Sequence, residues 1–396
     1  MTSPIPSSSW GAMPTELKFK VMDQLAAGDD RQLVSADTRT YGSPWKAERE
    51  AALARARLLV PLAHTCRSMH AVAQDWAAHD PAVSAAATAR ALRHAAATHR
   101  GDPRAFRLAA RRLVDGVIHV GVDAAVLGVA SRYATARDID DQRDRIVAVI
   151  ACLLDEVRRD DRRLRSIQLS IPAQHLGRAG ALIDAVRGAN TRAAGPDRAV
   201  LLELAIDGDC AELEREAAWP EATALDLKAG GATLDLGRFP NLRHLALHGY
   251  DAVAAPDYSA NVQLQSVTMT NCPNLLAAPS VSALAKLRHF ALSNAPQMTQ
   301  EPDFSDNPEL RSFALVRTGI VRAPSLHANG KVERIDLSLS SFLDEVPQVG
   351  HLQLTELKLY ESTARLPGDS LAALRQRVGA ALQEHHIAVP LPWRAR

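Results

Sequence analysis

The chain has 396 residues, of which 47% are hydrophobic and only 4% aromatic, so its cores must be built from aliphatic side chains. Its 46 basic and 45 acidic residues give a formal net charge of +1, which argues against a general polyanion-binding protein, so no nucleic-acid partner is expected. The four cysteines lie far apart and form no Cys-x-x-Cys pair, which argues against a disulfide framework or a zinc knuckle. No apolar stretch reaches the length of about 18 residues that a transmembrane helix needs, so no membrane partner is expected.

Residues 1–12 are rich in serine and proline and carry neither a basic nor an apolar block. This pattern predicts a disordered leader and not a Sec signal peptide. An amphipathic helix is expected next, because Pro14 suits a first helical position and Leu17, Val21 and Leu25 recur at a spacing of four residues. A second apolar helical segment is expected at 58–73.

These two segments resemble an F-box. Met13-Pro-Thr-Glu-Leu17 matches the opening of that family, and Thr65-Cys-Arg-Ser-Met69 matches its closing corner. The module would span 13–80, with an unusually long insertion at about 27–57. The resemblance implies docking on a Skp1-type adaptor and hence on a cullin-RING ubiquitin ligase. Carried over by position, the adaptor-binding residues are Pro14, Leu17, Val21, Met22, Leu25, Leu58, Leu59, Leu62 and Met69. The alternative is an ordinary amphipathic helical cap.

Residues 81–200 are rich in alanine and arginine and show helical periodicity, as in 106–114 and 146–157. We therefore expect a helical linker that also caps the first repeat, so that the whole N-terminal half is all-α. A weak copy of the repeat described below, Leu164/Ile167/Leu169, lies inside this span.

The strongest pattern is an internal repeat over 201–365. An L-x-x-L-x-L motif recurs about eight times with starts 20 to 23 residues apart, for example at Leu242/Leu245/Leu247. Prolines at 256, 279, 302, 324 and 347 keep the same period. One such unit cannot bury its own apolar residues, whereas stacked units bury them in a continuous core. The motif therefore predicts an α/β solenoid, a leucine-rich repeat horseshoe with short extended or 3₁₀ return segments.

This region resembles the short leucine-rich repeats of bacterial effector proteins. Alternating strand positions should face a concave binding surface. The expected target-binding residues are His244, His248, Thr268, Thr270, His289, Ser293, Ser312, Val316, Arg334, Asp336, Lys358 and Tyr360. An amphipathic capping helix is expected at 366–386, because Leu371, Leu374, Val378 and Leu382 share one helical face.

These features predict a substrate-recruiting adaptor that binds an unknown host protein through its repeats and directs it to a cullin-RING ligase. The arginine-rich, lysine-poor composition and the leader resemble those of a bacterial type III secreted effector, which would act in the host cytoplasm or nucleus. No catalytic residue, metal site or cofactor is expected. Two alternatives stay open: a ubiquitin ligase with a novel catalytic region at 81–200, and a non-enzymatic repeat scaffold.

Overall fold

The computed structural model describes residues 81–122, 136–159, 163–192, 199–213, 219–230, 234–345, 348–362, 366, 368–379 and 382–383. The chain divides into two compact units, unit 1 up to Ala205 and unit 2 from Ile206. The predicted leader and F-box lie outside the described residues. So do all the predicted adaptor-binding residues, Pro14, Leu17, Val21, Met22, Leu25, Leu58, Leu59, Leu62 and Met69.

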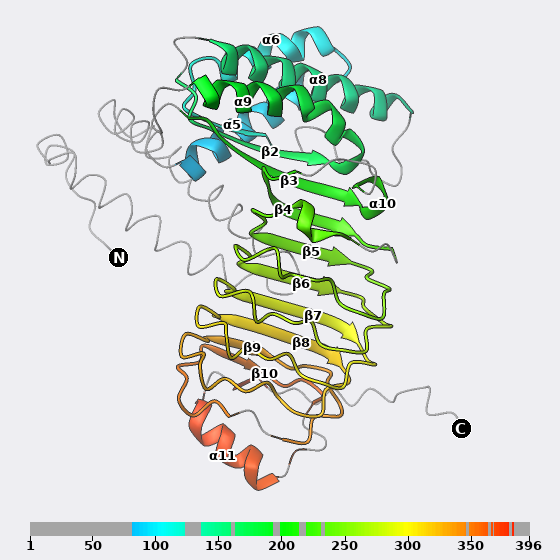
Figure 1. The fold of residues 1–396 in the computed structure, drawn as a ribbon, viewed down its shortest axis with the longest axis vertical. Coiled ribbons are helices and arrows are strands. Elements are labelled where there is room, and N and C mark those ends of the chain that lie inside the picture. The colour runs from blue at the N-terminus through cyan, green and yellow to red at the C-terminus, as the bar shows by residue number, and fades with distance from the viewer. Residues whose placement is uncertain are drawn as a thin grey trace, which may run out of the picture. The chain divides into compact units, whose positions relative to one another are not determined.

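Unit 1 contains helices α5 (Pro81–Thr98), α6 (Pro103–Val114), α8 (Ala136–Arg158) and α9 (Gly180–Arg192), with the 3₁₀ helix η1 (Ala173–Ala179) before α9. Helix α8 packs against both α6 and α9 (Figure 1). The start of α6 follows from its sequence. Asp102 accepts hydrogen bonds from the backbone N–H groups of Arg104 and Ala105, and Pro103 occupies a position where no N–H is needed.

Two parallel strands in unit 1 show that the prediction of an all-α linker at 81–200 is wrong. Strand β1 (His119–Val122) pairs with β2 (Ser166–Pro172), with His119 opposite Ser166. The weak repeat copy marked β2, since Leu164, Ile167 and Leu169 are all buried. These three residues have the same spacing as the apolar residues of the later repeats. This local pattern fits a buried strand, and it determines the structure here although the surrounding composition favours helix.

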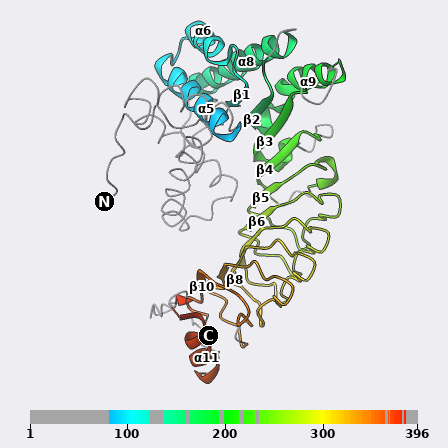
Figure 2. The same ribbon diagram turned by 90° about the vertical axis from the view of Figure 1, so that its left-hand side faces the viewer.

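The chain passes from unit 1 to unit 2 within β3 (Leu201–Asp209), which leads into the short helix α10 (Cys210–Leu213). Unit 2 then forms a parallel-sheet solenoid. Its successive strands are β4 (Ala222–Lys228), β5 (His244–His248), β6 (Ser266–Thr270), β7 (His289–Ala295), β8 (Ser312–Thr318), β9 (Arg334–Asp336) and β10 (Glu356–Lys358). Each strand pairs in parallel with the next. Figure 2 shows these strands along one side of unit 2 and the return segments along the other.

The core of unit 2 is the predicted apolar ladder. In β5, for example, Leu245 and Leu247 are completely buried, and Leu242 just before the strand is buried with them. Between β4 and β10 the described return segments consist of turns, extended chain and the 3₁₀ helix η3 (Leu236–Arg238), as expected for so short a repeat. Phe304, on one return segment, packs with its ring centre 5.4 Å from those of Phe290 and Phe313.

The turns that contain β5 to β10 each have a residue with left-handed backbone, either near the end of the strand or shortly after it. These residues are Gly249, Asn271, Asn294, Arg317, Leu339 and Glu361, with φ between 54° and 69°. Glycine and asparagine adopt this conformation readily, whereas other residues do so at a cost. The sequence alone does not reveal this position, because only half of the turns carry a residue that favours it.

Buried asparagines on the return side join successive turns. The side chain of Asn307 donates to the carbonyls of Val281 and Leu284, both at 2.9 Å. Asn261 and Asn329 each make the same pair of bonds to the turn before them. Each of these carbonyls also accepts from a backbone N–H of its own turn, so the asparagine bonds add a link between turns.

The C-terminal helix is shorter than predicted. Helix α11 (Gly368–Val378) buries Leu371 and Leu374 as expected, but it ends before Gly379, whose φ is +56°. A glycine in this conformation is a common helix terminator. Leu382 therefore lies not on the helix but in strand β11 (Leu382–Gln383), opposite Leu357 of β10. None of the helices that the structure describes is long and apolar enough to cross a membrane.

Candidate functional site

The candidate site is the open sheet face of unit 2, formed by the side chains of β4 to β10 that point away from the leucine core. The strand register arranges these side chains in three rows. The first row is Ala224, His244, Ser266, His289, Ser312, Arg334 and Glu356. The central row is Asp226, Ala246, Thr268, Ala291, Ala314, Asp336 and Lys358. The third row is Lys228, His248, Thr270, Ser293 and Val316.

The structure brings the predicted target-binding residues of β5 to β10 onto this face, and Tyr360 lies two residues after the end of β10. Two of them were expected to be exposed and are not. Thr268 is 2% exposed and Val316 4% exposed. Thr268 lies in the central row between its register partners Ala246 and Ala291, on strands only about 4.8 Å away, so little of its side chain contacts solvent.

A chain of hydrogen bonds crosses the first three strands of this face. His248 Nε2 lies 2.9 Å from Asp226 Oδ1, and His248 Nδ1 lies 2.8 Å from Thr270 Oγ1. Since a carboxylate only accepts, His248 Nε2 donates to Asp226. The three side chains are thereby held in one orientation across three turns.

The order carboxylate, imidazole, hydroxyl is also that of a catalytic triad, but the backbone around it does not supply an oxyanion site. The nearest amides are engaged in the sheet: Gly249 N–H donates to Thr270 O at 2.8 Å, and Asn271 N–H donates to Ser293 O at 3.0 Å. Acyl-transfer catalysis needs free donors beside the nucleophile. We therefore interpret this chain of bonds as a preorganised polar surface.

Two neutral histidines dominate the middle of the first row. Burial, together with nearby arginines, lowers the pKa of His244 and that of His289 to about 4 each. His289 Nδ1 lies 2.8 Å from Ser312 Oγ on the next strand. His244 Nδ1 and the hydroxyl of Ser266, its register partner, are buried, and neither has a hydrogen-bond partner in the described part of the chain.

The last turns of the face are acidic as well as basic. Burial raises the pKa of Asp336, whose Oδ1 accepts from the backbone N–H of Ser338 at 3.0 Å. Lys358 lies opposite Asp336 and forms an ion pair with Glu356 at 2.8 Å. The charges at this end of the face therefore largely compensate one another.

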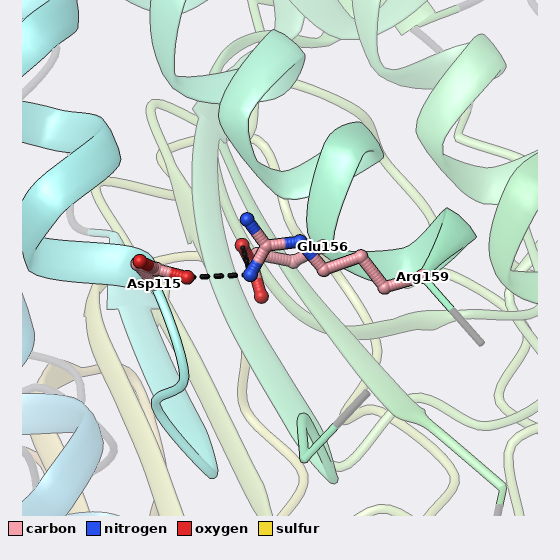
Figure 3. A network of polar contacts seen from close by, with 3 residues as sticks. All are labelled: Asp115, Glu156 and Arg159. Carbon is pink, nitrogen blue, oxygen red and sulfur yellow. Dashed lines mark hydrogen bonds and ion pairs between the residues drawn. The ribbon is translucent and has the colours of Figure 1, made fainter. Parts of the chain in front are cut away.

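A polar cluster in unit 1 has a structural role. Arg159, just after α8, contacts Glu156 at 2.9 Å and Asp115, at the end of α6, at 2.5 Å (Figure 3). The Arg159 guanidinium lowers the pKa of Asp115, whereas burial raises that of Glu156. Arg159 bridges the two carboxylates across the ends of two packed helices, so the cluster holds α6 to α8.

The described cysteines do not have the environment of a reactive thiolate. Cys152 in unit 1 and Cys210 and Cys272 in unit 2 are buried. Burial raises the pKa of Cys152, and it raises that of Cys272 to about 12. A nucleophilic cysteine needs a lowered pKa and access to its substrate. No group of three or more metal-ligating side chains occurs among the residues that the structure describes.

Comparisons with known proteins found only distant similarities, among solved structures. No protein-family model matches it, and no curated protein matches it. Among solved structures, it is similar to the functional domain of InlJ from Listeria monocytogenes, with 18% identity and a TM-score of 0.26 over 42% of this chain and 41% of that chain. The leucine-rich repeat domain of the type III effector XopL matches with 13% identity and a TM-score of 0.25, over 75% of this chain and 94% of that domain. A third match is TLR13, in a complex with ssRNA13, with 12% identity and a TM-score of 0.27 over 60% of this chain and 50% of that chain.

Proposed function

We propose that unit 2 is a protein-binding scaffold whose open sheet face holds a segment of a target protein. The observation that carries this proposal is the set of side chains fixed across turns, above all His248 bonded to both Asp226 and Thr270. Polar groups held in place before binding cost less entropy when a partner arrives. The floor of small residues, such as Ala291 and Ala314, leaves room for side chains of the partner.

A pair of variants tests this proposal. Ala291→Arg/Ala314→Arg fills the floor of the face, whereas Ala277→Arg/Ala285→Arg adds the same charges on exposed return segments. Full-length proteins serve as bait in host-cell extract, and captured proteins are identified by mass spectrometry. We expect targets that the wild type and the return-segment variant capture and that the floor variant loses. Identical capture by all three proteins would contradict a role for the face.

The N-terminal module would connect this scaffold to ubiquitination. We propose that residues 13–80 dock on a Skp1-type adaptor and that the chain thereby directs its target to a cullin-RING ligase. The support is the F-box resemblance of Met13–Leu17 and Thr65–Met69. The composition that resembles a secreted bacterial effector adds the proposal that this occurs in the host cell.

Binding of a purified Skp1-type adaptor tests the docking proposal. Pro14→Ala/Leu17→Ala should abolish co-elution on size exclusion, whereas the leader variant Ser7→Ala/Ser8→Ala should co-elute like the wild type. Wild-type protein that does not bind the adaptor would refute the F-box interpretation and leave the scaffold proposal intact.

The rival proposal, a ubiquitin ligase with its own catalytic region at 81–200, has less support. The described cysteine of that region, Cys152, is 4% exposed, and burial raises its pKa. Ubiquitin transfer with only E1 and E2 present would favour the rival.

A further inference from the structure

Three arginines lie at the edge of the open sheet face where strands β7 to β9 begin. Arg288 directly precedes β7, Arg311 directly precedes β8, and Arg334 is the first residue of β9. Their backbones lie in adjacent turns, because Arg311 N–H donates to Arg288 O at 2.8 Å and Arg334 N–H to Arg311 O at 3.3 Å. We call these three residues the arginine edge.

The three residues of the arginine edge form no ion pair in the part of the chain that the structure describes. Glu309 lies near enough for Arg288 and Arg311 to lower its pKa, but its ion pair is with Lys331, at 2.5 Å. No carboxylate lies within ion-pairing distance of Arg288, Arg311 or Arg334 among the described residues. All three arginines lower the pKa of the adjacent His289. The potential that they produce at His289 is therefore positive.

A second observation points to a ligand at the same place. Beside the arginine edge, on strands β5 and β6, three buried polar atoms lack hydrogen-bond partners among the described residues: His244 Nδ1, Ser266 Oγ and Thr268 Oγ1. Ser266 is fully buried and Thr268 is 2% exposed. Buried polar groups are normally satisfied, and groups that are not often belong to a binding site. Hydroxyls and a neutral imidazole can bond a peptide group or a carboxylate.

We propose that the arginine edge, with the polar atoms of His244, Ser266 and Thr268 beside it, binds an acidic segment of the target protein. A guanidinium matches a carboxylate with two parallel hydrogen bonds. Adjacent strands are about 4.8 Å apart, so the edge spans about 10 Å, whereas side chains on one face of an extended peptide repeat every 7 Å or so. Two or three acidic residues at alternate positions therefore fit.

A nucleic acid fits this surface less well than an acidic peptide does. Glu333 directly precedes Arg334, with its N–H donating to Arg311 O at 2.8 Å, and Asp336 and Glu356 follow toward the C-terminus. A phosphate backbone that continued across these turns would meet carboxylates, whereas a short acidic segment held by Arg288 and Arg311 can end before them. The formal net charge of +1 also gives little long-range attraction for a polyanion.

The test uses full-length protein and a fluorescein-labelled Glu-Ser-Glu-Ser-Glu-Ser-Glu peptide, with fluorescence anisotropy as the readout. Arg288→Gln/Arg311→Gln should weaken binding at least tenfold. The matched control Arg317→Gln/Arg322→Gln removes the same charge from elsewhere in unit 2 and should bind like the wild type. Circular dichroism confirms that each variant is folded. A lysine–serine peptide of the same length should not bind.

Three outcomes would overturn the inference. The first is equal peptide binding by the wild type and the edge variant. The second is oligo-uridine binding as tight as peptide binding and equally sensitive to the edge variant, which would indicate a nucleic-acid site. The third is displacement of the peptide by an equimolar amount of inorganic phosphate, which would indicate a small-anion site.

The inference rests on the proposed scaffold function, yet the two can fail separately. If the floor variant loses its captured targets but the edge variant binds the peptide like the wild type, only the proposal of an acidic segment is refuted, and the scaffold proposal stands.

Discussion

His289 Nδ1 lies 2.8 Å from Ser312 Oγ, so an imidazole on one turn of the solenoid is bonded to a hydroxyl on the next. The same relationship joins His248 to Thr270, again at 2.8 Å. In unit 1, His119 and Ser166 form a third such pair across β1 and β2 at 2.8 Å. Parallel pairing places these side chains directly opposite one another, and a neutral histidine can accept from the hydroxyl.

The neutral state of the buried histidines should make unit 2 sensitive to acid. The pKa of His244 and that of His289 are about 4 in the folded protein and near 6.5 in the unfolded chain. The unfolded state therefore binds more protons between these values, and the free energy of unfolding falls as the pH drops through 6.5 toward 4. Between pH 7 and pH 5 each histidine should cost about 2 kcal/mol, as measured by urea unfolding.

The double variant His244→Gln/His289→Gln should flatten this pH dependence, because neither replacement titrates. Asp336 acts in the opposite direction, since its raised pKa adds stability as the pH falls. The exposed His94→Gln of α5 is the control and should keep the slope of the wild type. An unchanged slope in the double variant would show that other groups control the acid response.

The asparagines of the return side should be important for stability. Asn307→Ala removes two buried hydrogen bonds, to the carbonyls of Val281 and Leu284, each of which keeps a bond from a backbone N–H. We expect the free energy of unfolding of unit 2 to fall by about 2 kcal/mol. Asn241→Ala, which removes one exposed bond to Pro220 O, should cost less than about 1 kcal/mol. Equal effects of the two variants in urea unfolding would refute this role.

The repeat was predictable because its apolar residues recur in phase. Leu245 and Leu247 of β5, like their counterparts in the other strands from β4 to β10, are buried as the motif requires. The strands of the N-terminal half were harder to predict. Strand β1 is a single short segment, His119–Val122, and its partner strand lies 47 residues later in the sequence. Such a pairing leaves no periodic trace in the sequence.

The candidate site was predictable by position but not by chemistry. Alternation placed His244, His289 and Arg334 on one face, and the register confirms it. The burial of Thr268 depends on the strands that pair with β6 on either side, which no single repeat contains. Arg288 and Arg311 precede their strands at a position that usually faces solvent, so the sequence does not mark them as binding residues. Only the structure shows that neither forms an ion pair with a described residue of a neighbouring turn.

Gly121 should not tolerate a side chain. A Cβ atom at this position of β1 would lie 2.1 Å from the carbonyl oxygen of Ala85 in α5. Gly121→Ala must therefore push α5 away from β1, and we expect unit 1 to lose about 1–3 kcal/mol or more in urea unfolding. Gly180→Ala, at a position with nothing within 4 Å, is the control and should be neutral or slightly stabilising. A stable Gly121→Ala protein would contradict the close packing of α5 on β1.

The left-handed residues at equivalent positions of the solenoid turns allow a reciprocal test. Arg317 is exposed and has a φ of 54°, so Arg317→Gly should relieve backbone strain and raise the free energy of unfolding by up to about 1 kcal/mol. Gly249 has a φ of 69°, and a Cβ atom added there would have nothing within 4 Å, so Gly249→Ala adds strain without a clash and should lower the free energy of unfolding by about 1 kcal/mol. Urea unfolding measures both variants. Because the two positions are equivalent in different turns of the solenoid, changes of the same sign would show that the left-handed backbone does not determine stability there.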